Sequence, residues 1–135
     1  MKELTVDADV KKIPAVTDFI NGILEEAGCP IKVQMQIAVV IDELFANIAM
    51  YAYDGGKGEA IVGVDVSGEP QVVSITFKDR GKPFDPLAKE DPDVTLSVEE
   101  RPIGGLGIFM VKKMMDEVIY KYEEGVNVLT VRKKI

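Results

Sequence analysis

The segment from residue 32 to about residue 53 constrains the fold of this 135-residue chain most strongly. Its apolar residues recur with the spacing of an α-helix, at Ile37, Val40, Ile41, Leu44 and Ile48. A helix with such an apolar stripe buries it against another layer of secondary structure. The same helix carries Glu43 and Asn47, four residues apart on one side, although neither residue type is usually buried without a partner.

Strand and helix patterns surround this segment. Strands are predicted at residues 2–8, 59–67, 71–79, 116–124 and 127–135, and further helices at residues 10–27 and 105–115. This order predicts an α+β fold, a two-layer α/β sandwich in which a mixed, mostly antiparallel sheet is covered on one face by three helices. We expect residues 1–135 to form a single domain, with a flexible lid in the long aperiodic segment at about residues 82–103.

Composition disfavours several classes of function. The net charge is −7 and no basic stripe is visible, so we expect no binding to nucleic acid. The chain has a single cysteine, Cys29, and no signal-peptide core, so we expect a cytoplasmic protein without a membrane partner. It contains no histidine, so its chemistry must rest on other side chains or on a borrowed metal ion.

Glu43 and Asn47 allow two interpretations. Such a pair can lie at a helix edge where polar residues meet solvent. Alternatively, it marks a site at the border of the core, where the amide oxygen of Asn47 binds Mg²⁺ and Glu43 accepts a proton from an attacking hydroxyl group. Because Mg²⁺ commonly takes only one or two protein ligands, one asparagine suffices only if a nucleotide supplies further oxygens.

Asp79 ends the strand at residues 71–79, and it has the same parity as the apolar residues that face the core. It is therefore expected to point toward the helices, on the side of Glu43. One interpretation is a residue that starts a turn. The other is a carboxylate that accepts a hydrogen bond from the exocyclic amine of adenine. Gly81, two residues later, would then let the backbone approach the base closely.

A third group of residues opens the helix predicted at residues 105–115. Gly104, Gly105 and Gly107 leave backbone N–H groups exposed at the start of this helix, where an anion can bind. The Gly-Lys-Ser/Thr sequence of a Walker A loop does not follow. The glycines alone therefore do not identify a nucleotide.

In this order, the three groups resemble the N, G1 and G2 boxes of the GHKL superfamily of ATP-binding proteins, which have the Bergerat ATPase fold. The matching stretches are DELFAN, DRGKPFDP and GGLGIFMVKKMMDEV, and the resemblance covers about residues 38–118. The short chain and the G-x-PFDP pattern look like the anti-sigma-factor serine/threonine-protein kinases of the histidine-kinase-like ATPase family. One departure is Tyr51, which stands where members of the superfamily often have a histidine.

The resemblance implies roles for the residues singled out above. Asn47 would be the Mg²⁺ ligand and Glu43 the catalytic base. Asp79 would bind adenine in a pocket shaped by Gly81. The three glycines at residues 104, 105 and 107 would hold the phosphates of ATP beneath the lid, where Arg101 is the candidate contact to the terminal phosphate.

The resemblance also implies an activity and partners. The expected function is that of a Mg-ATP-dependent kinase that phosphorylates a serine or threonine on a STAS-type antagonist and sequesters a sigma factor. The family further suggests a homodimer. The alternative is a nucleotide-gated protein-binding module with little or no phosphotransfer, because both functions need the same pocket for ATP and Mg²⁺.

Overall fold

The computed structural model describes residues 1–88 and 106–135. Within them, one five-stranded sheet has the strand order β1-β2-β3-β5-β4, and every neighbouring pair is antiparallel. The strands are β1 (Lys2–Asp7), β2 (Glu59–Ser67), β3 (Val72–Asp79), β4 (Glu117–Glu123) and β5 (Val126–Lys134). The predicted sheet was mostly antiparallel, and the described one is antiparallel throughout.

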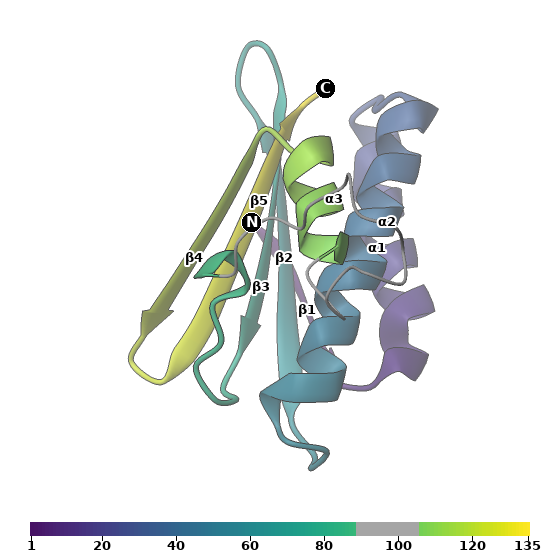
Figure 1. Cartoon of the computed structure of the whole chain (residues 1–135). Helices are drawn as coiled ribbons and strands as arrows, with labels where there is room; N and C mark the ends of the chain where they lie inside the picture. The colour runs from purple at the N-terminus through teal and green to yellow at the C-terminus, as the bar shows by residue number, and fades with distance from the viewer. Residues whose placement is uncertain (89–105) are drawn as a thin grey trace.

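Three α-helices cover one face of this sheet, as Figure 1 shows. They are α1 (Ile13–Glu26), α2 (Ile31–Asn47) and α3 (Leu106–Met114), and the short helical turns are η1 (Val10–Lys12), η2 (Ile48–Ala52) and η3 (Pro86–Ala88). The two-layer α+β sandwich predicted from the sequence is therefore confirmed.

The apolar core lies between the two layers. Its largest fully buried side chains come from α1, α2 and the central strands: Ile20, Leu24, Ile37, Ile41, Leu44, Phe45, Ile75 and Phe77. On β3, the alternate residues Val73, Ile75 and Phe77 are buried, and the last buried position in this row is Asp79. A carboxylate thus ends a row of apolar side chains that faces the helices.

The long second helix changes its geometry after Asn47. We expected one uniform helix to about residue 53, whereas α2 ends at Asn47 and continues as a π-helix, η2. A π-helical turn holds more residues than an α-helical turn, and such turns are frequent at functional sites. Here the change leaves Tyr51 51% exposed, while Ile48 and Ala52 on the same turn remain buried.

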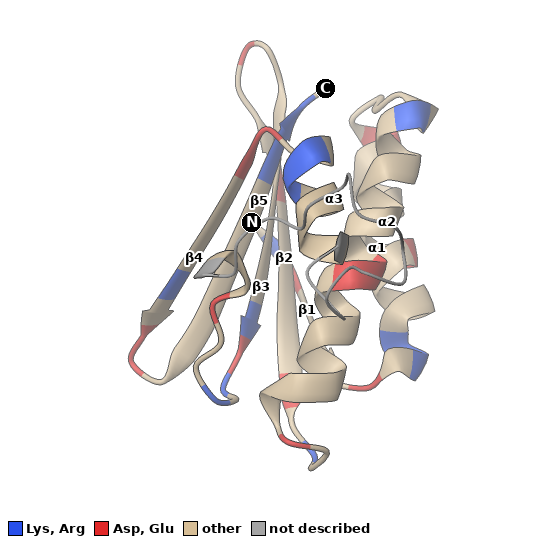
Figure 2. Cartoon of the chain, in the orientation of Figure 1, with Lys and Arg blue, Asp and Glu red and all other residues tan. Residues whose placement is uncertain are grey.

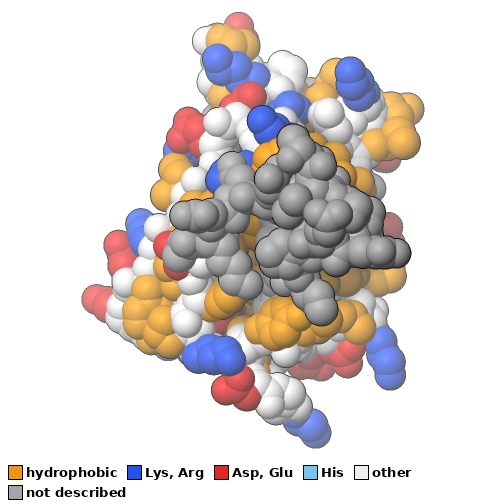
Figure 3. Space-filling model, in the orientation of Figure 1, with side chains coloured by type: hydrophobic (Ala, Val, Ile, Leu, Met, Phe, Trp, Pro, Cys, Tyr) orange, Lys and Arg blue, Asp and Glu red, His pale blue; other side chains and the backbone are white. Residues whose placement is uncertain are grey.

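The helical segment Ile31–Ala52 has 22 residues, and a stretch of 18 of them has a mean hydropathy of 1.4, so by length and composition alone it could cross a membrane. One side of it packs Val40, Ile41 and Phe45 into the core, which is the ordinary place of such a helix in a globular domain. On its outer side Ile31 and other apolar residues are exposed, and Figure 3 shows hydrophobic side chains at the surface of this layer. We therefore interpret the segment as a core helix.

Candidate functional site

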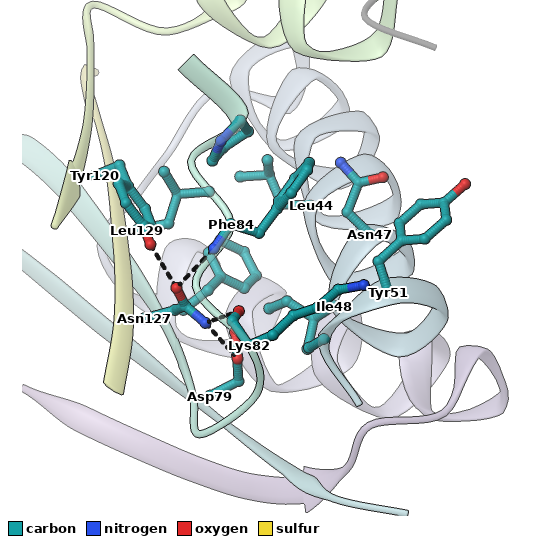
Figure 4. Close-up of a pocket in the computed structure, with 13 residues that line it drawn as sticks. Leu44, Asn47, Ile48, Tyr51, Asp79, Lys82, Phe84, Tyr120, Asn127 and Leu129 are labelled. Carbon is teal, nitrogen blue, oxygen red and sulfur yellow. Dashed lines mark hydrogen bonds between the residues drawn. The ribbon is translucent and has the colours of Figure 1, made fainter. Parts of the chain in front are cut away.

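A pocket opens between the sheet and the η2 end of α2 (Figure 4). Its helical wall consists of Leu44, Asn47, Ile48, Tyr51 and Ala52. The sheet contributes Phe77, Asp79, Tyr120, Asn127 and Leu129, and the loop after β3 contributes Lys82, Phe84 and Pro86. Apolar walls with a few convergent polar groups are typical of a small-molecule binding site.

Asn47 and Tyr51 stand on successive turns of the helical wall. Asn47 is the last residue of α2, and Tyr51 belongs to η2. Figure 4 shows both side chains on the same side of the pocket, across from Asn127 and Asp79. Asn47 is half-buried and Tyr51 is exposed, so a bound molecule could reach the amide oxygen of one and the hydroxyl group of the other.

Asp79 lies in the wall formed by the sheet, where only 7% of the residue is exposed. Its Oδ1 atom accepts a hydrogen bond from the backbone N–H of Gly81 at 2.9 Å. Gly81 in turn lies against η2, because a Cβ atom there would come within 2.2 Å of the carbonyl oxygen of Ala52. This close approach of two backbones explains the glycine. A contact of Gly81 with adenine stays a prediction.

Asn127, at the start of β5, is a polar residue of the pocket that the sequence analysis missed. It is 6% exposed and lies directly opposite Asp79 in the antiparallel register of β3 and β5. Its Nδ2 atom donates to Oδ1 of Asp79 at 2.9 Å. A signal was available, since Asn127 has the same parity as the core residues Leu129 and Val131.

Tyr120, on β4, completes this polar cluster. Its hydroxyl group donates to Oδ1 of Asn127 at 2.5 Å. Burial raises the pKa of Tyr120, the nearby carboxylates of Asp85 and Asp79 raise it further, and a hydrogen bond with the backbone of Phe84 opposes them. The net effect is upward, so the hydroxyl group keeps its proton and acts as a donor near neutral pH.

Glu43 lies one helical turn before Asn47 and is not among the residues that line this pocket. It faces the start of α3 instead, because a Cβ atom on Gly107 would lie 2.0 Å from its Oε1 atom. Figure 2 shows the acidic part of α2 beside the beginning of α3. Asp79 therefore shares its pocket with Asn47 rather than with Glu43, toward which we expected it to point.

Gly107 is the second residue of α3 and is the one predicted phosphate-binding glycine within the described residues. Gly104, Gly105 and Arg101 lie outside them, as does most of the predicted lid. Their assignment to the phosphates of ATP stays a prediction.

The next question is whether side chains of the described residues could bind a metal ion. In residues 1–88 and 106–135 no three side chains of the Asp, Glu, His or Cys type come together as they would to hold a metal ion. A cation held by Asn47 alone would therefore need most of its oxygen ligands from another molecule. Phosphate oxygens and water supply such ligands to Mg²⁺.

The side chains of the pocket fit an adenine nucleotide, but the free volume of the pocket is smaller than a purine base. A buried carboxylate faces apolar walls, as recognition of an exocyclic amine demands. The free space measures about 40 Å³, which is enough for a few water molecules only. Figure 4 shows the ring of Phe84 extending across the pocket beside Leu44. The ring of Phe84 is therefore among the side chains that limit the space for a purine base.

The family model for the histidine kinase-like ATPase domain matches residues 6–133. Because the match spans almost the whole chain, the protein belongs to the histidine kinase-like ATPase domain family. Membership of this family implies use of ATP.

Curated relatives carry a more specific name. The serine-protein kinase RsbW of Listeria monocytogenes serovar 1/2a is 28% identical over 129 residues, covering 87% of this chain and 82% of that protein. RsbW of Staphylococcus aureus strain MSSA476 is 24% identical over 130 residues, covering 93% of this chain and 82% of that protein.

A solved structure agrees with the fold. The structure of the RsbU and RsbW domains of Rv1364c from Mycobacterium tuberculosis superposes with a TM-score of 0.66 and 20% sequence identity over 99% of this chain. This chain corresponds to 32% of that longer chain. The similarity therefore concerns the arrangement of strands and helices.

Proposed function

We propose that this chain is a Mg-ATP-dependent serine/threonine-protein kinase of the anti-sigma-factor type. The observation that carries the proposal is the buried carboxylate of Asp79 in a pocket whose opposite, helical wall carries Asn47. Membership of the ATPase family and similarity to proteins named serine-protein kinase RsbW support it. The net charge of −7 fits a protein partner better than nucleic acid.

Each proposed role is the one that the resemblance in the sequence implies, and the position of the residue supports it. Asp79 accepts a hydrogen bond from the amine of adenine, and Asn47 offers its amide oxygen to Mg²⁺. Bound Mg-ATP supplies the phosphoryl group for transfer. Glu43, beside the start of α3, accepts the proton of the substrate hydroxyl group. Phosphoryl transfer depends mainly on positioning and electrostatics, so a chain without histidine can carry it out.

The proposed partners are proteins of the bacterial cytoplasm. The substrate is a serine or threonine on a STAS-type antagonist, and the sequestered partner is a sigma factor. The names of the relatives support the kinase activity, and the resemblance in the sequence supports the two partners and the homodimer.

Incubation with γ-labelled ATP, Mg²⁺ and a purified STAS-domain partner tests the proposal. We expect label on a serine or threonine of the partner and none when Glu43→Gln replaces the normal chain. Binding of the partner that depends on ATP, without any label on it, would favour the nucleotide-gated module instead. The observation that favours this second function is that Glu43, the proposed catalytic base, does not line the pocket.

A further inference from the structure

We infer that Asn127 is a positioning residue that directs Oδ2 of Asp79 at the adenine base and thereby sets the preference of the site for a purine with an amino group. The inference rests on the proposed function, since it assigns a determinant of specificity to the same nucleotide pocket. It follows from how the hydrogen bonds of two buried side chains are divided between their atoms.

The first step concerns the carboxylate of Asp79. Its Oδ1 atom accepts two hydrogen bonds, from the backbone N–H of Gly81 and from Nδ2 of Asn127, both at 2.9 Å. Two bonds fill the usual capacity of one carboxylate oxygen. Among the described residues, no hydrogen bond reaches Oδ2. The second oxygen is therefore the one left to accept a hydrogen bond from a ligand.

The second step concerns the orientation of the amide of Asn127. Its Nδ2 atom lies against oxygens only: Oδ1 of Asp79 at 2.9 Å and the carbonyl oxygens of Lys82 at 2.9 Å and Gly81 at 3.5 Å. Its Oδ1 atom accepts hydrogen bonds from donors only, the hydroxyl group of Tyr120 and the backbone N–H of Phe84. Reversing the amide would place an oxygen against three oxygens, so these contacts fix one orientation.

The third step is what this orientation does to the pocket. Figure 4 shows Asn127 joining Asp79, on β3, to the loop that carries Lys82 and Phe84 and to Tyr120 on β4. Asp79 and Asn127 are buried, and every polar atom of the Asn127 amide has a partner, so the hydrogen bonds of Asn127 hold these side chains in one geometry. Without Asn127, Asp79 would lose one of the two bonds that hold Oδ1, and the carboxylate could rotate. The oxygen offered to the base would then no longer be fixed.

The test compares two nucleotides that differ in the group at issue. Mg-ATP and the Mg²⁺ complex of purine riboside triphosphate, which lacks the exocyclic amine, are each titrated into the full chain by calorimetry. We expect the normal chain to bind ATP roughly 10- to 100-fold more tightly, the range for a hydrogen bond to a charged group. In Asn127→Ala the ratio of the two affinities should fall to about 3 or less, because only the affinity for ATP depends on the orientation of the Asp79 carboxylate.

Two further variants keep the test sharp. Tyr120→Phe removes one donor to Asn127 without removing the amide, and the same ratio should fall by a few fold even if Asn127→Ala does not fold. Thr130→Val serves as the matched control, since Thr130 makes its cross-strand contact with Thr76 on the opposite face of the sheet. We expect its ratio to equal that of the normal chain.

The outcomes separate this inference from the proposed function. A normal chain that binds neither nucleotide would overturn both. A normal chain that prefers ATP, with the same preference in folded Asn127→Ala or in Tyr120→Phe, would overturn the role of Asn127 alone. A preference lost in Asn127→Ala, reduced by a few fold in Tyr120→Phe and kept in Thr130→Val would establish it, because a purely structural defect would weaken the binding of the two nucleotides equally.

Discussion

The base-binding end of the proposed site is held by hydrogen bonds between strands, whereas its catalytic end depends on the packing of two helices. At the first end, Asp79 and Asn127 face each other across neighbouring strands and share a bond of 2.9 Å. At the second end, Glu43 lies against Gly107 with no room for a Cβ atom between them. We infer that recognition of the base is fixed by the sheet, while the position of the catalytic base follows the position of α3.

The first test of this comparison is at the catalytic end, where Glu43→Gln removes the charge of the side chain and keeps its shape. Glu43→Gln should lower the rate of phosphotransfer roughly 100- to 10,000-fold, because a neutral amide cannot accept the proton of the substrate hydroxyl group. ATP affinity should change by no more than a few fold, since Glu43 does not line the pocket. Transfer assays with labelled ATP and calorimetry measure the two quantities. A variant that transfers phosphate at the normal rate would show that Glu43 is not the base.

Removing the charge at the base-binding end should lower the affinity for ATP and leave the transfer rate nearly unchanged. Asp79→Asn should weaken ATP binding by about 10- to 100-fold, since a charged acceptor of the adenine amine is lost. At saturating ATP, the transfer rate should stay within a few fold of normal. Calorimetry of ATP binding decides the matter, and unchanged affinity would remove Asp79 from the site.

The packing at the catalytic end can be tested with one added methyl group. Gly107→Ala places a Cβ atom at the carboxylate of Glu43, so that the carboxylate has to move. The transfer rate should fall by about 10- to 100-fold, the size of effect expected from a displaced catalytic group. ATP affinity should fall less than the transfer rate, because Asp79 and the other residues that bind the base are unchanged, even though Gly107 is also a predicted contact to the phosphates. Equal losses of rate and affinity would contradict the separation of the two ends.

Gly22 offers a matched control for this substitution. It lies exposed within α1, and a Cβ atom there would meet nothing within 4 Å. Gly22→Ala should raise the free energy of unfolding by about 0.5–1 kcal/mol, because alanine favours the helix, and it should leave transfer unchanged.

The smallest expected effect concerns the pH dependence of the network at the base-binding end. Burial, joined by nearby carboxylates, raises the pKa of Tyr120 above its ordinary value of 10.0, so the folded state holds the phenolic proton more firmly than the unfolded state. The resulting stabilisation is complete below pH 10 and is lost as the pH rises toward the folded-state pKa. Denaturant unfolding at increasing pH should therefore show a steeper loss of stability in the normal chain than in Tyr120→Phe. If the free energy of unfolding fell equally with pH in the two proteins, the raised pKa of Tyr120 would be contradicted.

Local patterns in the sequence predicted much of the fold. The alternation of apolar residues in β2 and β3 and the helical stripe of α2 placed the core, and the parity of Asp79 placed its carboxylate in the row that faces the helices. These features depend on neighbours a few residues apart, which is the range over which periodicity is informative.

The network around Asn127 depends instead on long-range pairing. Asn127 and Asp79 are 48 positions apart, and they meet only because β5 inserts between β3 and β4 in a particular register. No local pattern specifies that register. The π-helical turn after Asn47 likewise meets a segment far along the chain, because the backbone of Ala52 lies against Gly81 and accepts a hydrogen bond from the N–H of Lys82.

The most direct measurement of the central claim is a calorimetric titration of the purified chain with Mg-ATP and, separately, with Mg-GTP. Guanine presents a carbonyl oxygen where adenine presents its amine, so a fixed carboxylate in the pocket should reject it. The account predicts one ATP per chain, bound at least about tenfold more tightly than GTP. No heat with ATP, or equal affinity for the two nucleotides, would contradict it.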